Sequence, residues 1–138
     1  MSGKMISSSD EIRNILQTSR RIVMLGASRN PARPSHGIFS YLVAHGYEVI
    51  PVNPGGGELA GVPIERGTGD ITPPVDIVNV FRNPATLDDS LIDECKRLRA
   101  KVLWMQDGVV RPDLAEKATQ EGIDVVMDDC IYRRHSML

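Results

Sequence analysis

An alternation of short apolar runs with amphipathic segments constrains the fold of this chain more than any other feature. Five apolar runs, at 21–26, 48–52, 76–81, 101–105 and 123–127, have the length and continuity of strands buried on both faces. Apolar residues at helical spacing predict helices over 36–45, from Asn83 to about Arg99, and from Pro112 to Gly122. This alternation predicts an α/β fold, with one doubly wound parallel sheet of about five strands and helices on both faces.

A further helix is predicted ahead of the first strand. Ser8 and Glu11 have the spacing of a capping box, in which each residue satisfies a backbone amide of the other. Apolar residues then follow at helical spacing. We therefore expect an N-terminal helical arm over residues 1–19 and one domain over residues 20–138.

Three other segments fit the alternation less simply. Pro51 lies in the second apolar run and predicts an edge strand or the end of a strand, because proline cannot donate to a neighbouring strand. Residues 58–74 predict no more than a short strand near 62–64. The tail over 128–138 has a mixed composition and predicts no single element.

The composition argues against several classes of function. The 138 residues suit one domain, and 16 Lys and Arg against 18 Asp and Glu give a net charge of −2. This balance supplies no basic field for nucleic acid, and one Trp, three Tyr and two Phe are too few for a base-stacking platform. No apolar run is long enough for a membrane span, no secretion signal is visible, and two cysteines make no disulfide framework. We expect a cytoplasmic protein that binds neither nucleic acid nor membrane.

The loop after the first predicted strand is the strongest candidate site. Ligands of open parallel sheets bind beyond the carboxyl ends of the strands, and a glycine there lets the chain turn sharply. Ser35 is predicted to cap the next helix, which would leave the amides of His36 and Gly37 free for an anion. Arg29 and Arg33 add forked donors that suit phosphate oxygens. The alternative interpretation is a surface loop with solvated arginines.

The same loop lacks the usual dinucleotide-binding fingerprint. The G-x-G-x-x-G pattern needs glycine where Ser28 and Pro31 stand. NAD-binding proteins also place Asp or Glu at the end of the second strand to hold the ribose diol, whereas this chain has Asn53 and Pro54. These residues favour a phosphorylated nucleotide and argue against an ordinary NAD site.

Longer motifs follow one another along most of the chain. They are Gly26-Ala27-Ser28, Asn30-Pro31, Arg33-Pro34-Ser35, the run from His45 to Pro54, Pro74-Val75-Asp76, Val80-Phe81-Arg82, Trp104-Met105-Gln106, Gly108-Val109, Val126-Met127-Asp128, Cys130-Ile131 and His135. In this order they resemble the small stand-alone CoA-binding proteins of bacteria and archaea, which are related to the CoA-binding domain of the succinyl-CoA synthetase alpha chain. The resemblance covers residues 21 to about 135.

This resemblance implies a Rossmann-like domain with coenzyme A or acyl-CoA as its ligand. It implies that the loop holds the pyrophosphate, that the end of the second strand lines the adenosine side, and that Phe81 and Arg82 close over the ligand. Coenzyme A also carries a ribose 3′-phosphate, which suits arginines where NAD needs a carboxylate. Together with the loop argument, the candidate binding residues are Gly26, Ala27, Ser28, Arg29, Arg33, Pro34, Ser35, Gly37, Asn53, Pro54, Phe81 and Arg82.

No residue is assigned a catalytic or metal-binding role. Cys130 and His135 lie near the end of the last strand and suggest a nucleophile pair, but their spacing matches no secure catalytic or metal-binding pattern. A buried cysteine in a structural tail is the simpler interpretation. Cys95 lies on an apolar helical stripe and Trp104 lies in a strand, so both are predicted core residues.

Several functions stay open at this point. The first is a CoA-binding protein without catalysis of its own. The others are an NAD(P)-dependent oxidoreductase, a CoA-thioester enzyme that uses Cys130 or His135, and a CoA-binding accessory subunit that docks on an acyl-CoA synthetase. The missing acid at the end of the second strand counts against the oxidoreductase. The sequence does not choose between a monomer, a homo-oligomer and a synthetase partner.

Overall fold

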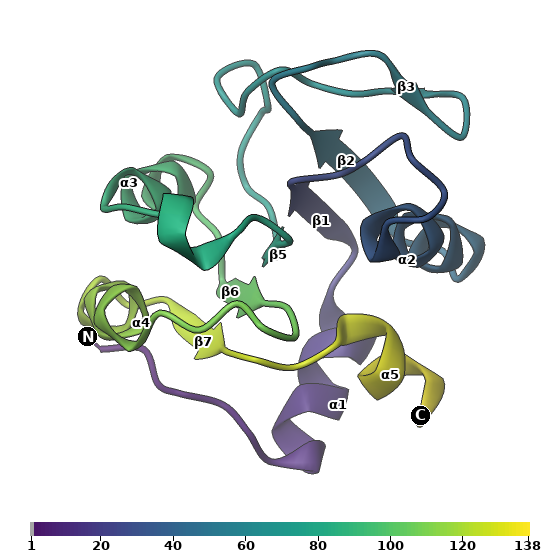
Figure 1. Cartoon of the computed structure of the whole chain (residues 1–138). Helices are drawn as coiled ribbons and strands as arrows, with labels where there is room; N and C mark the ends of the chain where they lie inside the picture. The colour runs from purple at the N-terminus through teal and green to yellow at the C-terminus, as the bar shows by residue number, and fades with distance from the viewer. Residues whose placement is uncertain (1) are drawn as a thin grey trace.

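A central parallel sheet organises the computed structural model, which describes residues 2–138 (Figure 1). Its strands are, in spatial order, β2 (Glu48–Val52), β1 (Arg21–Leu25), β5 (Ile77–Val80), β6 (Val102–Met105) and β7 (Asp124–Val126). Every neighbouring pair is parallel. The predicted doubly wound α/β sheet is therefore confirmed, and Pro51 lies in the edge strand β2 as expected.

Helices cover both faces of the sheet (Figure 1). Side chains of α3 (Ser90–Arg97) and α4 (Pro112–Gln120) share one apolar cluster with the strand residues that face them. Side chains of α1 (Ser9–Thr18), α2 (Pro34–Ala44) and α5 (Ile131–Ser136) share a second cluster with the alternate strand residues. Cys95 and Trp104 are fully buried, in the first and second cluster respectively, which confirms them as core residues.

The strand order creates a switch point beside β1. From β1 the chain passes through α2 to the edge strand β2 and then returns to β5, on the other side of β1. The helix after β1 packs on one face and the helix after β5 packs on the other face. Connections that leave neighbouring strands in opposite directions open a crevice between the strand ends, which is where ligands bind in such folds.

The N-terminal segment packs against the sheet. The Ser8 hydroxyl oxygen accepts the Glu11 amide at 3.2 Å, which confirms Ser8 as the cap, whereas the Glu11 carboxylate accepts the Ser8 hydroxyl at 3.1 Å instead of the Ser8 amide. The buried side chains of α1 belong to the same cluster as β1. Ahead of α1, Met5 forms a parallel bridge with Val125, so this segment also lies along the outer strand β7.

The helix predicted from Asn83 to about Arg99 is wrong in its first part. The chain forms the short 3₁₀ helix η1 (Pro84–Thr86), and α3 begins only at Ser90. The Asn83 side chain accepts the Ala85 amide at 2.9 Å, and the Asp88 side chain accepts the Ser90 amide at 2.9 Å. These side-chain acceptors compete with the backbone hydrogen bonds of a helix, so α3 begins later in the chain than predicted.

The short strand expected near 62–64 is present as β4 (Val62–Pro63), and it pairs antiparallel with β3 (Glu58–Leu59), which the sequence did not predict. The mixed tail contains α5, whose only buried side chain is Ile131. No helix within residues 2–138 has the combination of length and apolar character that a membrane span requires.

Candidate functional site

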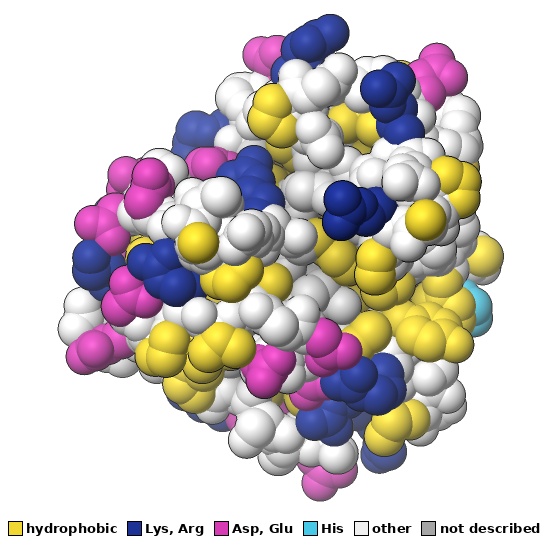
Figure 2. Space-filling model, in the orientation of Figure 1, with side chains coloured by type: hydrophobic (Ala, Val, Ile, Leu, Met, Phe, Trp, Pro, Cys, Tyr) yellow, Lys and Arg dark blue, Asp and Glu magenta, His cyan; other side chains and the backbone are white. Residues whose placement is uncertain are grey.

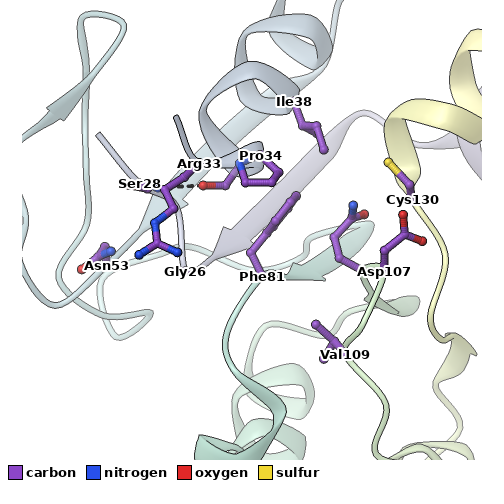
Figure 3. Close-up of a pocket in the computed structure, with 12 residues that line it drawn as sticks. Gly26, Ser28, Arg33, Pro34, Ile38, Asn53, Phe81, Asp107, Val109 and Cys130 are labelled. Carbon is purple, nitrogen blue, oxygen red and sulfur yellow. Dashed lines mark hydrogen bonds between the residues drawn. The ribbon is translucent and has the colours of Figure 1, made fainter. Parts of the chain in front are cut away.

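A cavity of about 500 Å³ opens at the carboxyl edge of the sheet, at the switch point (Figure 3). Its volume lies within the range of small-molecule sites. Predicted binding residues that line it are Gly26, Ser28, Arg33, Pro34, Ser35, Asn53 and Phe81. The other lining residues are Ile38, Gln106, Asp107, Val109 and Cys130. Figure 3 shows Ser28, Arg33 and Asn53 on one side, Asp107 and Cys130 on the other, and Phe81 between them.

Gly26 makes the turn from β1 into the loop. Its backbone has φ +83°, and an added Cβ would lie 3.1 Å from the Arg82 nitrogen and from the Phe81 carbonyl carbon. A larger side chain would therefore be strained and would press on the end of β5. The predicted sharp turn is confirmed, and its close approach to β5 brings Phe81 to the cavity.

Ser35 has a different role from the one predicted. Arg33, not Ser35, is the N-cap of α2, because Pro34 occupies the first helical position and starts the helix earlier. Ser35 lies in the first turn, is only 3% exposed, and its hydroxyl oxygen accepts the Ser28 amide at 3.0 Å. Ser35 therefore ties the loop to the helix instead of capping it.

The first-turn amides are less available than the sequence predicted. The His36 amide donates to the Arg33 carbonyl at 3.1 Å, so the expectation that it is free is wrong. The Ser28 amide is likewise engaged by Ser35. Gly37 does not line the cavity, and a Cβ placed on it would meet no atom within 4 Å. The Arg33 guanidinium, rather than a free first-turn amide, is the main anion-binding group that this side of the cavity offers.

Asn53 explains why this position is not an acid. Its side-chain amide donates to the Ala27 carbonyl at 2.8 Å, and its side-chain oxygen accepts the Gly55 amide at 3.0 Å. A carboxylate has no hydrogen to donate to the carbonyl of the neighbouring loop. Asn53 thus joins the β1–α2 loop to the turn after β2, and the end of β2 stays free of negative charge.

The opposite side of the cavity carries a neutralised carboxylate. Arg133 donates to both oxygens of Asp107, at 2.9 and 3.0 Å. These hydrogen bonds lower the pKa of Asp107 and keep it ionised. Beside it, the Gln106 side-chain oxygen accepts the Ile131 amide at 2.9 Å and so fixes the start of α5 at the cavity wall.

The remaining predicted residues lie outside the main cavity. Ala27 and Arg29 line a neighbouring depression of about 260 Å³, which also includes Ser28 and Asn53. The Arg82 guanidinium lies 4.0 Å from a carboxylate oxygen of Glu94. The Pro54 carbonyl accepts a hydrogen bond from Arg66 at 3.3 Å.

Cys130 and His135 do not form a pair. Cys130 lines the main cavity, whereas His135 lies in a separate depression and its Nδ1 is 2.8 Å from the Tyr41 hydroxyl. Burial lowers the pKa of His135, with a smaller contribution from His45. Cys95 is remote from the cavity in the apolar cluster, and burial raises the pKa of its thiol to about 12.

Five residues that line the cavity were not among the predicted binding residues, although four of them lie shortly after a strand of the sheet. Gln106, Asp107 and Val109 follow β6, and Cys130 follows β7, which is where ligands of parallel sheets bind. Ile38 lies on α2, one turn after Pro34. The edge of the sheet was therefore a usable signal for four of these residues, whereas the inward direction of Ile38 depended on how α2 packs.

Comparison with known proteins places the chain among relatives of the same size and fold. Residues 20–136 match the family described as the CoA binding domain. An uncharacterized protein of Bacillus subtilis, YneT, is 39% identical over 127 residues, which cover 92% of this chain and 93% of that protein.

Solved structures agree with the sequence comparison. A protein of Thermus thermophilus is 39% identical and superposes with a TM-score of 0.85, covering 95% of this chain and 98% of that chain. A hypothetical protein of Pyrococcus horikoshii is 31% identical with a TM-score of 0.89, covering 96% and 92%. These values show a common fold along nearly the whole length of each protein.

Proposed function

Because this chain belongs to the CoA binding domain family, we propose that it binds coenzyme A or acyl-CoA in the cavity at the carboxyl edge of its sheet. The observation that carries the proposal is the division of the cavity wall. One side presents Arg33, which has no carboxylate partner among residues 2–138. The other side presents Phe81, Val109 and Cys130, together with Asp107, whose charge is neutralised by Arg133. Coenzyme A has the same division, with an anionic nucleotide at one end and a pantetheine arm at the other.

The proposal assigns each part of the ligand to a wall of the cavity. The pyrophosphate lies against the β1–α2 loop, where Arg33 supplies forked donors and Ser35 holds the loop in shape. The adenosine lies toward Asn53 at the end of β2. The arm extends along Phe81 and Ile38 toward the side lined by Val109 and Cys130.

An NAD-dependent oxidoreductase is the less favourable alternative. Its ribose diol needs an acceptor at the end of β2, but both polar atoms of the Asn53 side chain are already engaged by the chain itself. A CoA-thioester enzyme would need a base beside Cys130, and His135 faces Tyr41 in a different depression. The proposed function is therefore binding without a chemical step.

A thermal-shift panel with CoA, acetyl-CoA, NAD, NADP and ATP tests the proposal. A ligand at 100 times its Kd stabilises the folded state by about 2.7 kcal/mol. For a chain of this size we expect the melting temperature to rise by about 5–10 °C with CoA or acetyl-CoA. A rise with NAD and none with either CoA species would contradict the proposal. Turnover of acetyl-CoA that disappears in Cys130→Ser would identify a thioester enzyme instead.

A further inference from the structure

We infer that Cys130 is a site of covalent modification, at which the protein forms a mixed disulfide with coenzyme A by thiol–disulfide exchange. The inference rests on the proposed function and adds one reversible chemical step to it. The substrate class is a disulfide of CoA, in which two CoA molecules are joined through their sulfur atoms. From the sequence, the simpler interpretation of Cys130 was a buried structural cysteine, but the structure places it in the wall of the cavity.

Cys130 lies across the cavity from the arginine that carries the proposed function. It is a free cysteine with 8% of its surface exposed, and it lines the cavity together with Arg33. Figure 3 shows the two side chains on opposite sides of the cavity. Coenzyme A has its pyrophosphate in the nucleotide and its thiol at the far end of the pantetheine arm. A CoA molecule whose pyrophosphate contacts Arg33 therefore directs its sulfur toward the side that carries Cys130.

A second feature of the same wall points to a ligand. Gln106 lines the cavity, is only 5% exposed, and its side-chain oxygen accepts the amide of Ile131, the residue after Cys130, at 2.9 Å. Its side-chain nitrogen donates to no group within residues 2–138. Asn79 is fully buried and donates to the Gln106 oxygen at 3.3 Å, while its own side-chain oxygen has no partner within residues 2–138. Buried polar atoms without a partner are rare in folded proteins, so these two amides indicate a polar ligand group beside Cys130.

The charges around Cys130 do not oppose a thiolate. Asp129 accepts the Cys130 amide at 2.9 Å. Both Arg133 and Arg134 donate to the Asp129 carboxylate at 2.9 Å. Arg133 also donates to both oxygens of Asp107. Two carboxylates and two guanidinium groups therefore balance at this wall, and a thiolate, which is the attacking species in disulfide exchange, forms there without net repulsion.

The exchange balances without a further oxidant. The Cys130 thiolate attacks one sulfur of the CoA disulfide, and the bond between the two CoA sulfur atoms breaks. A new bond joins the Cys130 Sγ to the CoA that stays in the cavity. The other CoA leaves as a thiolate and takes up the proton that Cys130 released, so the disulfide is reduced as Cys130 is oxidised. Unlike thioester cleavage, this step needs no base beside the cysteine, because cysteine supplies some thiolate near neutral pH.

The second cysteine of the chain is an internal control. Cys95 is fully buried in the apolar cluster that contains α3, and it is not among the residues that line the cavity. Burial raises the pKa of its thiol to about 12. A buried thiol of this kind is inert toward disulfides. The cysteine that carries an adduct therefore reports whether the cavity directs the reaction.

Incubation of the wild-type protein with CoA disulfide, followed by mass spectrometry of the intact chain and of its peptides, tests the inference. We expect one CoA to be attached through Cys130, none through Cys95, and complete release by a reducing agent. Glutathione disulfide, which has no nucleotide, should react about 10- to 100-fold more slowly, because binding in the cavity raises the effective concentration of CoA disulfide. Cys130→Ser should form no adduct with either disulfide.

Two arginine variants test whether nucleotide binding drives the exchange. Arg33→Ala should slow the reaction with CoA disulfide toward the rate seen with glutathione disulfide, because the nucleotide loses its proposed anchor. Arg20→Ala is the matched control and should react at the wild-type rate. Arg20 is an exposed arginine just before β1, at the edge of the sheet opposite to the cavity.

The outcomes separate the inference from the proposed function. Equal rates with CoA disulfide and glutathione disulfide, or an adduct on Cys95, would overturn the inference. Reversible binding of reduced CoA in titration calorimetry, with no adduct from CoA disulfide, would also overturn it and would leave the proposed function standing. Absence of any binding of reduced CoA, with both disulfides reacting at the same slow rate, would overturn the proposed function as well.

Discussion

The two rims of the cavity use arginine in opposite ways. On the rim formed by the β1–α2 loop and β2, Arg29 and Arg33 have no carboxylate partner among residues 2–138. On the α5 rim, Arg133 binds Asp107, and Arg134 donates to Asp129 at 2.9 Å. Figure 2 shows the same contrast, with a dark-blue side chain beside α2 among white and yellow atoms, and with dark blue next to magenta near α5.

The two kinds of arginine contact have different consequences for ligand binding and for the stability of the fold. A guanidinium that donates to a carboxylate of its own chain joins two segments and loses most of its attraction for a ligand. A guanidinium without such a partner keeps its charge and its donors for an anion. In the proposed function, the first rim therefore serves the ligand, and the α5 rim joins segments of the fold.

The largest effect is expected at Arg33. Arg33→Ala should weaken CoA binding by about 1.5–3 kcal/mol, because a hydrogen-bonded charge contact is lost. It should leave the melting temperature of the free protein nearly unchanged, since Arg33 forms no ion pair within residues 2–138. Calorimetry and thermal unfolding on one preparation measure both quantities. A lower melting temperature with unchanged affinity would reverse the roles assigned to the two rims.

Asp129 provides the converse test on the α5 rim. Its side chain accepts the Cys130 amide and the Arg134 guanidinium, both at 2.9 Å, and is only 14% exposed. Asp129→Ala should lower the free energy of unfolding by about 1–3 kcal/mol, because partly buried donors lose their acceptor. Urea unfolding measures this change, and Asp10→Ala, at a carboxylate 97% exposed, is the control. A variant with wild-type stability would contradict a structural role for this rim.

A smaller, pH-dependent effect is expected where α5 meets α2. Burial, and to a lesser extent His45, lower the pKa of His135 below its usual 6.5. The unfolded chain therefore binds a proton more readily than the folded protein, and the folded state loses stability as the pH falls through about 6.5. Urea unfolding at pH 7.5 and 5.5 should show this loss in the wild-type protein and less of it in His135→Gln. The same pH dependence in both proteins would remove His135 as its source.

Part of this architecture was predictable from local sequence. The apolar runs predicted all five strands of the main sheet, and Gly26 and the loop after it predicted one wall of the cavity. The prediction was less successful where side chains capture nearby backbone groups, as at Asn83, and where a short helix depends on distant contacts, as in α5. The first-turn amides were also misjudged, because Pro34 starts α2 earlier than expected.

The sequence by itself determined the succession of strands and helices and the edge of the sheet where the cavity opens. Both follow from the spacing of apolar residues and from the geometry common to parallel sheets. Only the tertiary structure decided which arginines remain free for an anion. Arg133 meets Asp107, and Arg66 meets Gly56 and no carboxylate of residues 2–138, through contacts that the order of residues does not show. The charge that a guanidinium offers to a ligand depends on those neighbours, and folding selects them.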